Sequence, residues 1–141
     1  MTSIPLLQKN TVLLTLFIIS ITACKKDDKS TPGPTPDTSA PVITVYSPND
    51  GDTLSISTGV ALSYRITDNM SVRIVEFLTT IPGTGDTINY SVEQHNAVFL
   101  NQSTTLSLSG VSISTPVQLS IKASDEAGNT ANKQITFQVI P

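Results

Sequence analysis

The side chains of this chain that could do chemistry are mostly carboxylates and amides in turn-like stretches. His95 is the single histidine, and no serine or cysteine stands in a recognisable nucleophile motif. Paired carboxylates can act as general acid and base. The pairs Asp125–Glu126 and Asp50/Asp52 fall in turn sequences, however, where aspartate commonly bonds its own backbone. The residues around His95 are polar, which predicts a solvated turn. We therefore expect no catalytic activity.

The same turns carry oxygen atoms of the kind that calcium binds. Calcium takes about six to eight oxygen ligands from carboxylates, amides and backbone carbonyls. Two strands that end at the pole of a β-sandwich where the first strand begins would gather these side chains: Asp37, Asp68, Asn69, Asp125 and Asn129. The candidate metal site is Asp68, Asp125 and Asn129, since Asp37 falls in a proline-rich linker. The alternative is that these residues only shape their turns, and then no cofactor is expected.

The elements that would position these residues are β-strands. Polar and apolar residues alternate over 59–67, 116–124 and 133–139, which predicts strands with one buried face. The residues expected on the buried faces are Val60, Leu62, Tyr64, Ile66, Val117, Leu119, Ile121, Ala123, Ile135, Phe137 and Val139. Shorter candidate strands are 42–46, 53–56, 72–79, 87–92, 97–100 and 104–109. Short strands at regular spacing predict an all-β fold, an antiparallel β-sandwich of about seven to nine strands.

Three motifs within residues 41–139 resemble bacterial immunoglobulin-like domains. Residues 41–51 read PVITVYSPNDG, residues 64–69 read YRITDN ahead of Val-Glu-Phe at 75–77, and residues 123–130 read ASDEAGNT. The resemblance implies an immunoglobulin-like sandwich. It specifies function poorly, because one fold hosts many functions. The cysteine pair and buried tryptophan of antibody domains are absent, so aliphatic packing must hold the sheets together.

The N-terminal residues indicate export. Residues 11–21 form an apolar run that suits a signal peptide and is too short to span a membrane. The run leads into Ile-Thr-Ala-Cys at 21–24, which resembles the lipobox of bacterial lipoproteins. The resemblance implies a signal peptide over residues 1–23 and lipid attachment to Cys24, the only cysteine. A buried helix that ends near a cysteine is the alternative, and the charged residues that follow disfavour it.

Residues 24–40 are expected to form a lipidated, flexible tether rich in Pro, Thr and Ser, and residues 41–141 the immunoglobulin-like domain. Lys-Lys-Asp-Asp follows at 25–28 and resembles the surface-export signals of Bacteroidota lipoproteins. This implies an outer membrane lipoprotein exposed at the cell surface. The alternative is a solvated tether, which suits the periplasmic leaflet equally well.

Composition narrows the expected partners. The net charge is −3 and no cluster of lysine and arginine exists, which excludes nucleic-acid binding. The lipid is the expected membrane contact. The expected function is that of a lipid-anchored cell-envelope module without catalytic activity, acting in adhesion, scaffolding or capture of a protein or glycan ligand. The alternative is a glycan-binding accessory lipoprotein of a polysaccharide-uptake system, with Tyr46 and Tyr90 as the candidate exposed aromatics.

Two short motifs suggest modification. Asp-Thr-Leu at 52–54 and Asp-Thr-Ile at 86–88 match the Bacteroidota O-glycosylation pattern, so Thr53 and Thr87 are candidate acceptors. The same residues could equally be junctions between turns and strands.

Overall fold

The computed structural model describes residues 33 and 35–141 of the chain. The predicted signal peptide, Cys24 and the charged residues at 25–28 lie outside the described residues. Residues 34–141 form a unit of their own. Within the described residues, no helix combines the length and the apolar character needed to cross a membrane.

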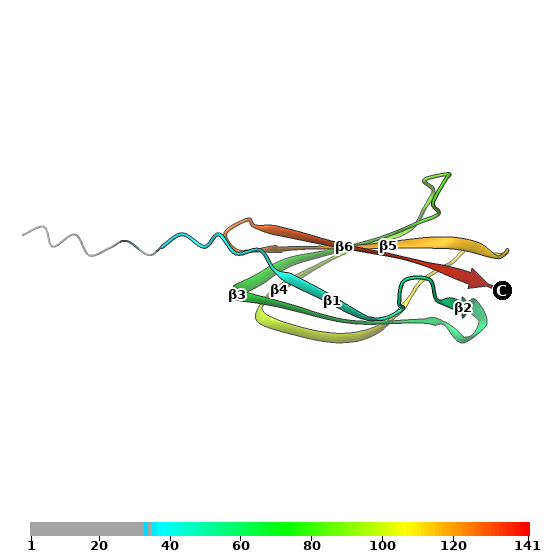
Figure 1. The fold of residues 1–141 in the computed structure, drawn as a ribbon, viewed down its shortest axis with the longest axis horizontal. Helices are drawn as coiled ribbons and strands as arrows, with labels where there is room; N and C mark the ends of the chain where they lie inside the picture. The colour runs from blue at the N-terminus through cyan, green and yellow to red at the C-terminus, as the bar shows by residue number, and fades with distance from the viewer. Residues whose placement is uncertain (1–32, 34) are drawn as a thin grey trace, which may run out of the picture. The chain divides into compact units, whose positions relative to one another are not determined.

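The described part of the chain is almost entirely β-structure (Figure 1). Its strands are β1 (Val42–Ser47), β2 (Thr53–Ser55), β3 (Val60–Thr80), β4 (Thr87–Leu106), β5 (Thr115–Asp125) and β6 (Thr130–Ile140), with a short 3-10 turn, η1 (Ile56–Thr58), after β2. The all-β prediction is confirmed. The strand count is six rather than the predicted seven to nine, because β3 joins two of the predicted strands and β4 joins three.

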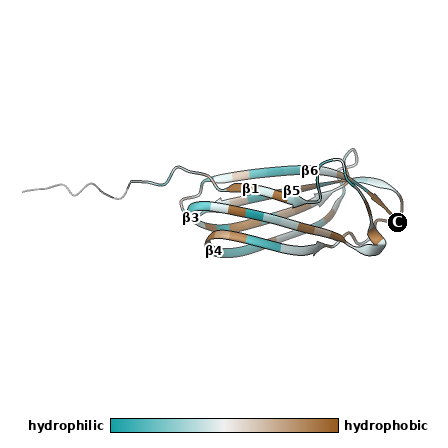
Figure 2. Ribbon diagram, turned by 60° about the horizontal axis from the view of Figure 1, so that its bottom comes forward, coloured by the Kyte–Doolittle hydropathy of each residue, from teal (hydrophilic) through white to brown (hydrophobic). Residues whose placement is uncertain are grey.

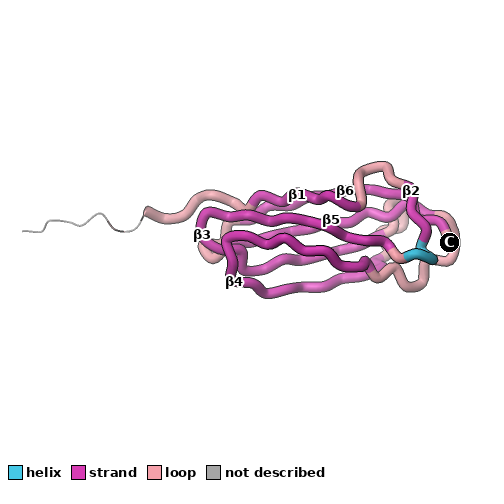
Figure 3. The backbone as a smooth tube through the Cα atoms, turned by 90° about the horizontal axis from the view of Figure 1, so that it is seen from below, coloured by secondary structure: helices cyan, strands magenta, loops and turns pink. Residues whose placement is uncertain are grey.

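β3 and β4 run through corners, which explains how they join several predicted strands. The pairing register of β3 with β4 is irregular between Thr67 and Val72. There the Met70 N–H donates to Asp68 Oδ1 at 2.9 Å, a local side-chain bond of the kind that favours turning over straight strand. The first part of β3 pairs with β1 and the second part with β5. The sheet therefore curls over on itself, as the tube in Figure 3 shows.

Strand pairing is antiparallel with one exception. The strand order is β1-β3-β5-β6-β2, and β4 pairs with β3. The short strand β2 pairs with β6 in parallel, with Leu54 opposite Val139. The antiparallel prediction is therefore wrong for this pair and correct for the other pairs of the described residues.

The core lies between the two parts of the curled sheet. Tyr64 in the first part of β3 and Phe77 in the second part have ring centroids 5.3 Å apart. All the residues predicted on the inward faces are buried, and Figure 2 shows the alternation of apolar and polar residues along the strands. Full burial of an aliphatic side chain stabilises by about 1.5–3 kcal/mol. Apolar packing therefore holds the curl together, as the sequence predicted.

One end of the domain gathers three segments that are far apart in sequence. Residues 35–41 join the sheet at the end where β3 turns back and where β5 connects to β6 (Figure 1). Pro41 is already buried. We call this end the tether pole, formed by residues 35–41, 67–72 and 125–130. It is the end at which the sequence analysis placed the candidate calcium ligands.

Candidate metal centre

The corner of β3 supplies the first ligand side chain. Asp68 Oδ1 accepts the Met70 N–H, and this bond fixes the carboxylate at the tip of the corner. The second oxygen, Asp68 Oδ2, is buried and has no hydrogen-bond partner among the described residues. Three residues further on, the Oγ of Ser71 is likewise buried without a partner. A buried polar atom without a partner costs free energy, so this corner holds acceptor atoms that the protein itself does not satisfy.

The turn between β5 and β6 supplies the second side chain. Asp125 Oδ1 accepts the backbone N–H of Asn129 at 2.8 Å, and Asp125 Oδ2 accepts the Asn129 side-chain amide at 2.7 Å. The Asp125 N–H donates in return to the carbonyl of Asn129 at 3.1 Å. Gly128 has φ +91°, a conformation that glycine adopts without strain. The turn therefore presents the carboxylate of Asp125, a residue that is only 4% exposed.

The chain ahead of β1 supplies the third side chain. The side-chain amide of Asn69 donates to Asp37 Oδ1 at 3.0 Å, and the amide of Asn129 donates to the Asp37 carbonyl at 3.2 Å. Asp37 Oδ2 is buried and has no hydrogen-bond partner among the described residues. Although Asp37 belongs to the stretch expected to be a flexible tether, it contacts the domain.

The three carboxylates converge at a distance that suits calcium. One oxygen from each of Asp37, Asp68 and Asp125 lies within 4.8 Å of the others. Oxygens that bind one calcium ion, each about 2.3–2.6 Å from it, lie no more than about 5.2 Å apart, so these three are close enough to share an ion. The donors are all oxygen, which suits a hard cation rather than zinc or copper. The residues present therefore fit calcium.

No ion pair of the described residues involves these carboxylates. The ion pairs of this part of the chain, Lys122–Glu76 and His95–Glu93, involve none of the three aspartates. Burial acts to raise the pKa of Asp125, but the bonds from Asn129 and from the backbone of the turn lower it below its ordinary value overall. The carboxylate is therefore held ionised by neutral donors, and a cation would supply the missing counter-charge.

The predicted site residues come together here. The structure brings Asp68, Asp125 and Asn129 into one cluster, as the sequence analysis proposed for the candidate site. It adds Asp37, which had been set aside as part of the linker, and it places Asn69 beside Asp37. Ser71 was missed, because nothing separates it in sequence from other serines.

The other carboxylate pairs have structural roles in their turns. Asp50 Oδ1 accepts the Thr136 N–H at 2.7 Å and Asp52 Oδ2 accepts the Asn49 N–H at 2.7 Å. These bonds agree with the interpretation of both residues as turn formers. Glu126, next to Asp125, is exposed.

The prediction for His95 is wrong. His95 lies within β4 rather than in a turn, its side chain is 16% exposed, and its Nε2 lies 3.2 Å from Glu93 Oε2. The reason is that β4 pairs only with β3 among the described strands, so polar side chains can lie on its inward side along the open margin of the sheet.

Burial, and next the Glu93 carboxylate, raise the pKa of Tyr64 to about 12.

The candidate modification and aromatic sites are at the surface. Thr53 and Thr87 are exposed first residues of β2 and β4, which is compatible with either interpretation of their motifs. Tyr46 is 49% exposed and Tyr90 is 56% exposed, as predicted. They do not form one platform, because β1 pairs with the first part of β3 and Tyr90 pairs with Leu78 in the second part.

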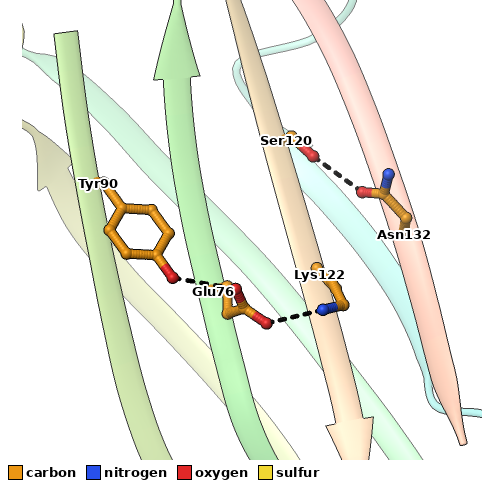
Figure 4. A network of polar contacts seen from close by, with 5 residues as sticks. All are labelled: Glu76, Tyr90, Ser120, Lys122 and Asn132. Carbon is orange, nitrogen blue, oxygen red and sulfur yellow. Dashed lines mark hydrogen bonds and ion pairs between the residues drawn. The ribbon is translucent and has the colours of Figure 1, made fainter. Parts of the chain in front are cut away.

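A row of polar contacts crosses the sheet from Tyr90 to Asn132 (Figure 4). The Tyr90 hydroxyl donates to Glu76 Oε2 at 3.1 Å, and Lys122 Nζ donates to Glu76 Oε1 at 3.0 Å. Lys122, and next Tyr90, lower the pKa of Glu76 below its ordinary value. The hydroxyl of Ser120 donates to the Asn132 side chain at 2.9 Å on the adjacent strands.

Comparisons with known proteins add no family assignment. No protein-family model matches this chain, and no curated protein matches it significantly. The case for the site therefore rests on the geometry of the tether pole.

Proposed function

We propose that this protein is a lipid-anchored module of the bacterial cell envelope that displays an immunoglobulin-like β-sandwich and holds a calcium ion at its tether pole. The observation that carries the proposal is the convergence of three carboxylates, within 4.8 Å of one another, where the tether joins the domain. The module acts without catalysis, in adhesion, scaffolding or ligand capture. The curled all-β sheet and the three motifs in residues 41–139 support the immunoglobulin-like assignment.

The chemistry of the pole supports calcium as a structural ion. The unpartnered Oδ2 atoms of Asp37 and Asp68 and a carboxylate oxygen of Asp125 would be the anionic ligands. The amides of Asn69 and Asn129 donate through nitrogen, which leaves their carbonyl oxygens as further candidate ligands. Extracellular calcium modules bind with dissociation constants of about 0.1–1 mM. A site of this affinity would be filled outside the cell and would hold the pole together.

Thermal melting tests the calcium site. A ligand bound only by the folded state stabilises it by RT ln(1 + [L]/Kd), which is about 1.4–2.7 kcal/mol for a ligand at about 10–100 times Kd. In about 10 mM calcium, the melting temperature of a domain this size should therefore rise by roughly 6–20 °C relative to EGTA. Asp68→Asn should abolish the rise. Asp86→Asn, the same change at an exposed turn, should keep it. An equal rise in both variants would contradict the site.

Lipid labelling tests the anchor. If Cys24 carries the lipid, Cys24→Ser should abolish incorporation of labelled fatty acid and leave an uncleaved precursor. Labelled Cys24→Ser protein would refute this anchor. Protease treatment of intact cells then tests the proposed surface exposure. Digestion of the domain on intact cells is the expected result, and digestion only after permeabilisation would assign it to the periplasmic side.

Glycan binding is a second candidate function, favoured by the surface around Tyr90. The exposed ring of Tyr90 is held by Glu76, and Lys122 lies on the other side of Glu76 (Figure 4). This offers an apolar ring face with polar groups beside it. Such a combination suits a sugar ring. A glycan array on the mature chain tests this function. Binding should be lost in Tyr90→Ala and kept in Tyr46→Ala, which removes an exposed tyrosine elsewhere, and equal retention in both would exclude this surface.

A further inference from the structure

The three aspartates of the candidate centre differ in how firmly the fold holds them. Asp68 and Asp125 belong to β3 and β5, whose backbones are fixed by sheet pairing. Asp37 precedes β1, and residues 35–41 are in no strand. Its described bonds to the domain are those from the side-chain amides of Asn69 and Asn129, at 3.0 and 3.2 Å. Asp37 is therefore the member of the cluster that can leave without breaking the sheet.

Charge decides whether Asp37 stays. Its carboxylate lies within 4.8 Å of two others, and like charges at such a distance repel one another. Two neutral hydrogen bonds stabilise the docked segment only modestly, and the loss of backbone freedom on docking opposes them. A divalent cation among the carboxylates would turn the repulsion into attraction. The balance between a docked and a released Asp37 therefore depends on whether the cation is bound.

We propose that calcium controls the docking of residues 35–40 onto the tether pole. The inference rests on the calcium site proposed above and adds that occupancy of this site sets where the ordered domain begins. With calcium bound, residues 35–40 belong to the ordered domain. Without calcium, the ordered domain begins at Pro41, which is buried.

Release would free the orientation of the anchored domain. The stretch ahead of β1 already leads away from the sheet when it is docked (Figure 1), so its release changes the angle of the domain rather than its reach. A cell-envelope module built in this way would be held at a fixed angle in calcium and would swing freely when calcium is scarce.

Hydrogen exchange read by mass spectrometry tests the inference on the mature chain. A peptide covering residues 35–40 reports the N–H of Ser39, which donates to Asp37 Oδ1 at 3.0 Å. Calcium at about 10 mM should slow exchange in this peptide at least tenfold relative to EGTA. A peptide from the middle of β4 should be unchanged. Asp68→Asn, which removes a proposed ligand and keeps the bond between Ser39 and Asp37, should exchange rapidly in both conditions.

Calorimetry on the same samples separates the two proposals. If calcium binds and exchange at residues 35–40 does not change, docking is independent of the ion and the inference is wrong, while the site stands. If calcium does not bind, the proposed site fails and the inference fails with it. Slow exchange at 35–40 in EGTA would also overturn the inference, because it would show that the segment docks without the ion.

Discussion

Replacing Asn129 by aspartate separates the two roles open to the residues of the tether pole. The Asn129 side-chain amide bonds both the Asp37 carbonyl and Asp125 Oδ2. If the cluster only shapes a turn, Asn129→Asp removes two bonds, adds a repelling charge, and destabilises the protein in every buffer. If the cluster holds calcium, the new carboxylate destabilises only the metal-free protein, because added ligand charge strengthens calcium binding.

The size of the effect follows from the bonds that are lost. A typical intramolecular hydrogen bond contributes about 1 kcal/mol, so Asn129→Ala should cost about 2 kcal/mol in EGTA. For a domain of about 100 residues this lowers the melting temperature by roughly 8–16 °C. The melting temperature of Asn129→Asp in EGTA should be lower still, because this variant adds like-charge repulsion to the same loss of hydrogen bonds.

Calcium should reverse the order of these variants. The wild-type protein is expected to gain roughly 6–20 °C in about 10 mM calcium. The calcium-induced rise in melting temperature should be larger for Asn129→Asp than for the wild type, and for Asn129→Ala it should be no larger than for the wild type. Asn101→Asp serves as the control for added charge, since Asn101 is an exposed residue of β4, and it should respond like the wild type.

Circular dichroism melts of the four proteins, each in EGTA and in calcium, give the answer. The comparison uses the calcium-induced shift of each protein rather than its absolute melting temperature, so a general loss of stability does not obscure it. If Asn129→Asp gains no more from calcium than Asn101→Asp does, residue 129 does not border the ion. If none of the four proteins gains stability from calcium, the carboxylates do not share an ion and the proposed site is refuted.

Two further predictions concern the core and its open margin. Ile121 is fully buried, so Ile121→Ala should cost about 2–5 kcal/mol in chemical denaturation, whereas Lys122→Ala, at a half-exposed neighbour in a surface ion pair, should change stability little; equal losses would mean that the register of β5 is wrong. The pKa of Tyr64 is raised from 10.0 to about 12 in the folded protein, so the neutral phenol stabilises the fold fully below about pH 10, and this stabilisation is lost as the pH rises towards 12. The free energy of unfolding should fall over this window by on the order of 1 kcal/mol after allowance for solvent screening. Tyr64→Phe should remove this fall.

The sequence predicts the inward faces well because alternation with a period of two is a local property. Tyr64 and Phe137 fall in alternating segments, and both are buried. The same local reasoning misplaces His95, because a polar residue on the inward side of an open margin looks in sequence like a turn residue. It also splits β3 in two at Asp68, since the sequence marks the corner without showing that strand pairing continues through it.

Contacts between distant segments are harder to predict from sequence. The parallel pairing of β2 with β6 involves three residue pairs, too few to leave a pattern. Asp68 and Asp125 are both turn signals, and the expectation that their turns share a pole predicted their meeting. The docking of Asp37 depends on two amide donors 32 and 92 residues away, and proline-rich composition around it indicates a free linker.

Isothermal titration of calcium into the mature chain tests the central claim most directly. We predict one calcium ion per chain, with a dissociation constant of about 0.1–1 mM. Asp68→Asn should abolish binding and Asp86→Asn should preserve it. Absence of any heat of binding up to about 10 mM calcium, or identical binding by the two variants, would contradict the claim that the aspartates of the tether pole form a calcium site.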